Sequence, residues 1–144
     1  MTMSKAEELI LLDTHVWIWL LNGNDQLISK TCLSVINQSV QSSNIRVSAI
    51  SIWELGMLES KGRIQIPTNC LDWVNKALEA PGILLAPMSP KIAIESSRLP
   101  GKFHGDPADR LIVSTARILD ATLMTRDKEI ISYGAQKYVK VLKV

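Results

Sequence analysis

The chain contains few of the residues that build disulfide frameworks and zinc sites. It has two cysteines and two histidines among 144 residues. Cys32 and Cys70 lack the spacing of metal ligands, so we expect two free thiols and a reducing compartment. His15 and His104 have no histidine or cysteine partner at ligand spacing, which argues against a zinc-type centre. We expect both histidines to stand at the rim of a site or in structural positions.

Long apolar runs and a strong excess of one charge are also absent. The apolar stretch of residues 9–21 is interrupted by Asp13 and His15 and falls short of a membrane span. The chain does not begin with a basic leader and a long apolar segment, so we expect a cytoplasmic protein with no membrane partner. The formal net charge is only +2, so any surface for a polyanion must be local.

Apolar residues are plentiful. They make up 47% of the chain, against 21% charged residues, a balance typical of a globular domain. The length of 144 residues suits a single hydrophobic core. We predict a polar leader at residues 1–8 and one domain over residues 9–144.

Short apolar runs alternate with helical patterns along the chain. Strands are predicted at 9–12, 45–48, 83–86, 121–125 and 138–142. Helices are predicted at 14–21, 29–41, from Ser48 or Ser51 to just before Gly62, at 67–80, at 89–97, and in a long segment opening at Asp106. This alternation predicts an α/β fold, a three-layer α/β/α sandwich around a mainly parallel central sheet.

Four acidic residues follow predicted strands or lie on helices nearby: Asp13, Glu54, Asp109 and Asp127. Ligands of open α/β sheets bind at the carboxyl ends of the strands, where Asp13 and Asp127 are expected. Clustered carboxylates repel one another unless a cation neutralises them, and oxygen ligands favour Mg²⁺ or Mn²⁺. The pattern indicates a metal-dependent hydrolase.

Each acid also has a structural interpretation. Asp13, Asp106 and Asp127 each precede a helical pattern and could be N-caps. Asp109 could complement a helix dipole, although one turn into the helix it is better placed than Asp106 to point across the sheet edge. Glu54 stands in an apolar stretch, where a carboxylate needs a partner. Asp106 therefore remains open between helix cap and additional metal ligand.

Two further groups of residues could serve a nucleic acid. The tryptophans lie in amphipathic helices and are predicted to be core residues more than base-stacking platforms. They are Trp17, Trp19, Trp53 and Trp73. Basic residues near the acids could hold phosphates, although scattered surface charge explains them as well. They are Lys61, Arg63, Lys102, Arg110, Arg126 and Lys128.

Four segments together resemble the PIN-domain ribonucleases, with the VapC-type toxins as relatives: residues 11–19, 48–55, 104–113 and 123–127. They carry the strings LLDTHVWIW, SAISIWEL, HGDPADRLIV and LMTRD. The resemblance extends over residues 9–144, and four motifs in this order are far more specific than one.

The resemblance implies an α/β/α sandwich in which Asp13, Glu54, Asp109 and Asp127 hold one or two Mg²⁺ or Mn²⁺ ions, with Asp106 as an extra acid. It also implies cleavage of single-stranded stretches of RNA, tRNA or ribosomal RNA among them. A cognate antitoxin would inhibit the enzyme, and the chain would form a homodimer. Thr14 and Thr125 are expected to orient ligands or water.

Two other functions fit parts of the pattern. A phosphotransfer module also places acids at strand ends, but it needs a second acid beside the nucleophile, which residues 13–15 do not provide. A non-catalytic RNA- or antitoxin-binding module would have lost its acids, and here all four are present. A metal-dependent cleavage assay separates the latter from an enzyme.

Overall fold

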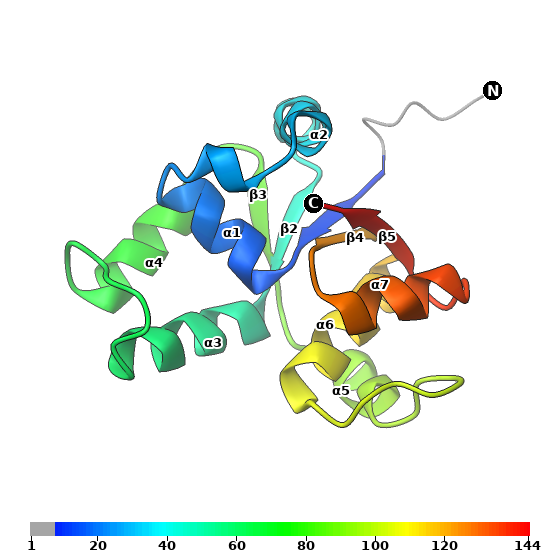
Figure 1. Ribbon diagram of the computed structural model, residues 1–144. Helices are drawn as coiled ribbons and strands as arrows, with labels where there is room; N and C mark the ends of the chain where they lie inside the picture. The colour runs from blue at the N-terminus through cyan, green and yellow to red at the C-terminus, as the bar shows by residue number, and fades with distance from the viewer. Residues whose placement is uncertain (1–7) are drawn as a thin grey trace.

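The computed structural model describes residues 8–144 and contains a sheet of five parallel strands in the order β3-β2-β1-β4-β5 (Figure 1). The strands are β1 (Ile10–Leu12), β2 (Ile45–Ser48), β3 (Ile83–Ala86), β4 (Thr122–Thr125) and β5 (Lys140–Lys143). The helices are α1 (Thr14–Leu21), α2 (Lys30–Gln41), α3 (Ala49–Ser60), α4 (Cys70–Leu78), α5 (Pro90–Ser96), α6 (Pro107–Leu119), α7 (Lys128–Ala135) and the short 3-10 helix η2 (Asp25–Leu27). The predicted α/β class with a parallel sheet is confirmed.

Alternate residues of the strands pack against helices on the two faces of the sheet. Leu12, Val47 and Met124 belong to one buried cluster, together with side chains of α1, α2 and α4. Leu11 and Leu123 belong to the other, which contains side chains of α6 and α7. Since both faces are covered, β1 at the centre of the sheet is apolar and buried throughout, as expected for a parallel sheet.

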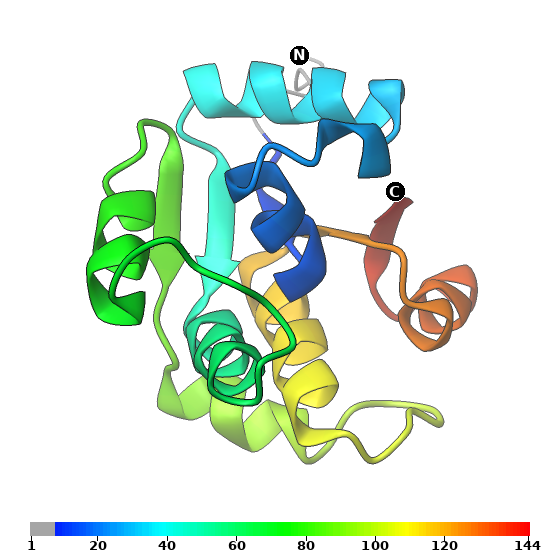
Figure 2. The ribbon, with the colours of Figure 1, turned by 60° about the vertical axis from the view of Figure 1, so that its left-hand side comes forward.

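The order of the strands indicates where this sheet would bind a ligand. β1 lies between β2 and β4, and the chain passes to one side of β1 in its first half and to the other side later. The crevice at such a reversal, outside the carboxyl ends of the strands, is the usual ligand site of open α/β sheets. Figure 2 shows β2 and β3 pointing the same way, toward α3 and α5, which lie at this end of the sheet.

Some element boundaries differ from the sequence-based predictions. The fourth helix begins at Cys70, three residues later than predicted, because the Asn69 side chain caps it by accepting from two backbone N–H groups. The last strand is Lys140–Lys143, two residues beyond the predicted start. The helix α7 fills a segment for which only a possible cap at Asp127 was foreseen. Apart from Glu8, the predicted leader lies outside the described residues.

Other predictions concern thiols, membranes and tryptophans. Cys32 and Cys70 are free, as predicted. None of the helices in residues 8–144 combines the length and apolarity needed to cross a bilayer. Trp17 is fully buried, but the expectation that every tryptophan is a core residue is wrong for Trp53, which is 56% exposed.

Candidate active site

Five carboxylates line one pocket of about 430 Å³ at the carboxyl ends of β1 and β4. They are Asp13, Glu54, Asp106, Asp109 and Asp127. The structure thus brings together all four predicted acids and the additional candidate. His15, Val16, Trp19 and Arg126 complete the lining.

Three of these acids are helix N-caps. Asp13 caps α1, Asp106 caps α6 and Asp127 caps α7. One oxygen of each accepts a backbone N–H bond, from Thr14 at 2.8 Å, Asp109 at 3.1 Å and Ile130 at 3.0 Å respectively. Figure 1 shows the first turns of α1, α6 and α7 converging near the middle of the molecule. The positive ends of the three helix dipoles favour negative charge in the pocket.

On one side of the pocket, buried hydroxyl groups hold two of the acids. We call this side the strand wall, and it consists of the acids Asp13 and Glu54 with the hydroxyl residues Thr14, Ser51 and Thr125. The Thr125 hydroxyl donates to Asp13 Oδ2 at 2.6 Å and accepts from the Asp127 backbone N at 3.0 Å. Thr14 Oγ1 donates to Glu54 Oε1 at 2.5 Å and lies 2.7 Å from Ser51 Oγ. Thr14 and Thr125, expected to orient ligands, therefore contact the acids directly.

The opposite side, which we call the loop wall, consists of His104, Asp106 and Asp109. His104 Nδ1 accepts from the Asp106 backbone N at 3.3 Å, and Nε2 lies 3.2 Å from Asp109 Oδ2. Because Nδ1 is the acceptor, we assign the proton of the neutral ring to Nε2, which faces Asp109 but makes no hydrogen bond within residues 8–144. His104 therefore lies against the Asp109 carboxylate, closer to the acids than the rim position predicted from the sequence.

Aromatic and guanidinium contacts fix the loop that carries His104. The Phe103 ring lies 4.4 Å from the His104 ring and 4.9 Å from the Tyr133 ring, centroid to centroid. The Arg110 guanidinium donates to the carbonyls of Ser96, Phe103 and His104. Since Arg110 is committed to these carbonyls, it is the weakest candidate among the predicted phosphate-binding residues.

Burial and mutual repulsion raise the pKa values of the carboxyls. Loss of solvent raises the pKa of Asp109 most, and repulsion from Asp106, Asp127, Asp13 and Glu54 adds to it, so that its pKa is about 7. The pKa values of Asp13 and Glu54 are also raised, again mainly by burial. Without a cation, the pocket therefore resists full ionisation.

The donor set fits a hard divalent cation. Oxygens dominate the pocket, and one ligand atom from each of His104, Asp109 and Asp127 lies within 4.8 Å of the other two. In the assigned tautomer the His104 nitrogen facing Asp109 carries a proton and has no hydrogen-bond partner within residues 8–144, so it would have to lose that proton to bind a metal itself. A cation among the carboxylates would relieve the repulsion that raises the pKa of Asp109.

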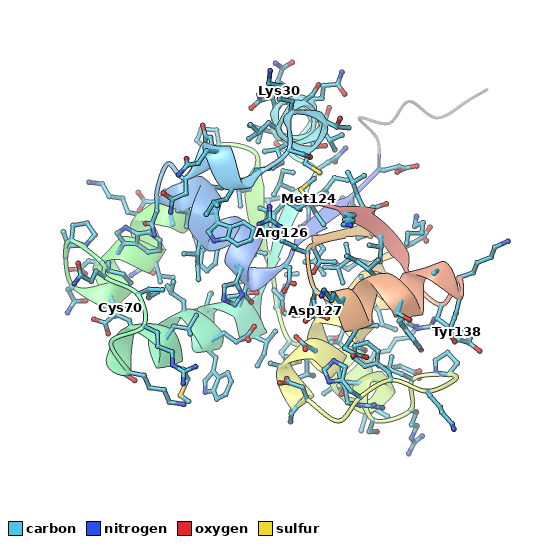
Figure 3. The ribbon with its side chains drawn as sticks, viewed as in Figure 1. Lys30, Cys70, Met124, Arg126, Asp127 and Tyr138 are labelled. Atoms are coloured by element: carbon cyan, nitrogen blue, oxygen red, sulfur yellow. The ribbon has the colours of Figure 1, made fainter. Side chains whose placement is uncertain are left out.

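The predicted basic residues lie in different places. Arg126 lines the acid pocket, and its guanidinium carbon lies 4.7 Å from the centroid of the Trp19 ring. Figure 3 shows Arg126 directed toward α1 and Asp127 toward α6. Lys61 and Arg63 line a neighbouring groove, and Lys102 is exposed on the loop before His104.

Comparison with known proteins agrees with this architecture. The PIN domain matches residues 10–136. The chain belongs to the PIN-domain family. Over 132 residues it is 33% identical to Ribonuclease VapC22 of Mycobacterium tuberculosis, a match that spans 92% of this chain and 97% of that protein.

Solved structures share this PIN fold at lower sequence identity. VapBC2 from Rickettsia felis, bound to a promoter DNA fragment, gives a TM-score of 0.64 at 18% identity, covering 94% of this chain and 98% of that chain. DNA-bound VapBC from Salmonella typhimurium gives 0.68 at 14% identity with the same coverage. FitAcB from Neisseria gonorrhoeae gives 0.60 at 20% identity, covering 93% and 96%.

Proposed function

We propose that this PIN-domain chain is a metal-dependent endoribonuclease and the toxin of a toxin-antitoxin pair. The observation that carries the proposal is the convergence of five carboxylates on one pocket, in which the pKa of Asp109 reaches about 7. A site built this way is electrostatically incomplete without a cation. The similarity to Ribonuclease VapC22 supports RNA as the substrate, with tRNA or ribosomal RNA as targets.

Asp13, Glu54, Asp109 and Asp127 would hold one or two Mg²⁺ or Mn²⁺ ions, with Asp106 at the edge of the set. When bound, the metal supplies Lewis acidity, which activates water for attack on a phosphodiester and neutralises the developing charge. Thr14 and Thr125 keep the strand-wall carboxylates in one orientation, and the His104 ring lies 3.2 Å from Asp109. Lys61, Arg63, Lys102 and Arg126 are proposed to contact the RNA backbone, with Arg110 a weaker candidate.

An antitoxin protein completes the proposal. The structures similar in fold include VapBC2, VapBC and FitAcB, of which the first two are bound to DNA. We expect a segment of the antitoxin to cover the acid pocket of this chain, with an apolar helix and an arginine near the carboxylates. A homodimer in the cytoplasm is part of the same proposal.

Metal removal tests the enzyme assignment. Purified protein, freed of any inhibitor, should cleave total RNA with Mg²⁺ or Mn²⁺ and lose that activity in excess EDTA, because the proposed ligands are hard oxygens. Cys32→Ser and Cys70→Ser are the control variants and should retain cleavage, since no thiolate takes part. Undiminished cleavage in EDTA would rule out the metal mechanism.

A further inference from the structure

A second cavity, a groove of about 600 Å³, adjoins the acid pocket. The two share His15, Glu54 and Asp106 in their linings. Away from the acids the groove is lined by Ile50, Trp53, Met57, Lys61, Arg63 and Pro107. We call this part the Trp53 groove. A ligand chain can therefore pass from the acids into the Trp53 groove without leaving the surface of the protein.

One face of α3 forms the floor of the Trp53 groove. Ile50, Trp53, Met57 and Lys61 follow one another at intervals of three or four residues, so their side chains lie on the same side of the helix. Glu54, on the same face, points to Thr14 in the acid pocket. From Glu54 to Lys61 the helix rises about 10 Å, at 1.5 Å per residue. The first turn of α6 forms the facing wall through Pro107.

Trp53 is the main apolar feature of this groove. Its side chain is 56% exposed, whereas Trp17 on α1 is fully buried. A single exposed apolar residue needs no explanation in a folded protein. Trp53, however, stands in a concavity with Met57 and Ile50 and next to the catalytic acid Glu54, which is a place where an aromatic face can receive a ligand.

Two cationic side chains line the Trp53 groove at and beyond the C-terminal end of α3. Lys61 and Arg63 are exposed, and neither side chain has a hydrogen-bond or ion-pair partner within residues 8–144. Lys61 could merely offset the negative end of the α3 dipole. Arg63 lies beyond the helix, so that explanation does not account for both charges. Together they offer positive charge to a phosphate.

We propose that the Trp53 groove binds unpaired nucleotides of the RNA strand next to the scissile phosphate. A base stacks on Trp53, and Lys61 and Arg63 contact the backbone beyond it. The base must be unpaired, because a base stacked within a duplex does not present its face to an indole. Repulsion from Glu54 and Asp106 keeps phosphates away from the near end of the groove unless a cation is bound. This inference rests on the proposed ribonuclease function and adds the surface that holds the unpaired strand beside the acids: Trp53, Lys61 and Arg63.

Binding without cleavage tests the stacking. A labelled, mixed-sequence single-stranded oligoribonucleotide is titrated with the full-length protein in EDTA, and fluorescence anisotropy gives the affinity. Trp53→Ala should weaken binding about tenfold, and Trp53→Phe should restore most of it by keeping an aromatic face. Leu71→Ala is the matched control, because Leu71 is an apolar residue with 66% exposure on α4. The same strand annealed into a duplex should not respond to the Trp53 substitutions.

The cations are tested through salt. Lys61→Gln and Arg63→Gln should each reduce the slope of log affinity against log salt by about 0.7, the value for one phosphate contact on a single strand. Lys30→Gln is the control, since Lys30 lies on α2, apart from Asp127 (Figure 3), and lines neither the acid pocket nor the Trp53 groove. An unchanged slope in both groove variants would contradict the phosphate contacts.

The outcomes separate this inference from the proposed function. If the protein cleaves total RNA with Mg²⁺ but Trp53→Ala binds the single strand as tightly as the unmodified chain, the Trp53 groove is not a nucleotide site, and a protein partner becomes its occupant. If the Trp53 dependence is found without cleavage under any metal condition, the ribonuclease proposal fails and the nucleotide site stands. Equal effects of Trp53→Ala on single strand and duplex would overturn the requirement for an unpaired base.

Discussion

The strand wall and the loop wall hold similar carboxylates by different means. In the strand wall, buried hydroxyls of Thr14, Ser51 and Thr125 hold the acids at the ends of the sheet. In the loop wall, Asp109 has no buried hydroxyl partner in the described part of the chain and instead lies 3.2 Å from the ring of His104, which a surface loop carries. The strand wall therefore couples site geometry to the stability of the fold, whereas the loop wall can change with little cost to folding.

The largest expected effect is on the loop wall. Asp109→Asn keeps the size of the side chain but removes the charge that a metal needs, so it should lower RNA cleavage by about a thousandfold or more. Folding should be retained, and the melting temperature in EDTA should rise as repulsion is relieved. Cleavage assays and thermal melts measure the two effects.

Asp72→Asn is the matched control for this substitution. Asp72 occupies the same place in α4 as Asp109 does in α6, with its backbone N–H bonded to the N-cap side chain. Cleavage should not change in Asp72→Asn. If Asp109→Asn retained full cleavage, the metal would have to be held by Asp106, one turn earlier.

A substitution in the strand wall should affect folding and activity together. Thr125→Val removes a hydroxyl that serves Asp13 and the Asp127 backbone, leaving both without that partner in a buried place. We expect a loss of about 1–3 kcal/mol in unfolding free energy and a 10- to 100-fold loss of cleavage. Urea denaturation and cleavage assays measure them, and Thr125→Ser should restore both.

Thr115→Val is the control for the loss of a buried hydroxyl. The Thr115 side chain is also buried, but its hydroxyl bonds only to the Leu111 carbonyl of its own helix. Its substitution should leave cleavage intact. Thr125→Val with unchanged stability would show that the strand wall is not coupled to the fold.

A substitution of His104 in the loop wall should affect metal binding but, unlike Thr125→Val, should change the stability of the fold little. His104→Ala leaves Asp109 with its charge but without the imidazole 3.2 Å away, so Mn²⁺ affinity measured by calorimetry should fall about 10- to 100-fold. Stability should change little, because the ring is partly exposed. His104→Gln should restore part of the affinity by placing an amide N–H near Asp109. A large loss of stability without loss of Mn²⁺ affinity would make His104 a purely structural residue.

Much of this fold could be predicted from the sequence, because strand runs and caps are local signals. The segment after β1 and the segment after β4 each place an aspartate at the sheet edge, so Asp13 and Asp127 were within reach of sequence reasoning. The helix α7 was foreseen only as a short helix that Asp127 could cap, because its eight residues include two adjacent isoleucines and a glycine, which are weak helix formers.

Other features depend on what covers a helix face, which periodicity does not reveal. Trp53 was predicted to be a core residue from the amphipathic pattern of α3, but in the fold its face borders an open groove. The contacts of His104 with Asp109 and of Arg110 with loop carbonyls depend on the path of the loop before α6. From charge and spacing alone, Arg110 was therefore predicted as a residue that could hold phosphate. His104 was predicted only to stand at the rim of a site or in a structural position.

The prediction with the least bearing on RNA cleavage is the pH dependence of stability without metal. The pKa of Asp109 is raised in the fold from its ordinary value of 3.8 to about 7, so the folded state binds the proton more tightly than the unfolded chain does. Protonation of Asp109 therefore stabilises the fold, and this contribution is lost as pH rises from about 4 to about 7. Asp13 and Glu54, whose pKa values are also raised, act in the same direction. Urea denaturation in EDTA should show a decline in unfolding free energy over this range that is shallower in Asp109→Asn and unchanged in Asp72→Asn. An equally steep decline in Asp109→Asn would place the titrating group elsewhere, on the strand wall.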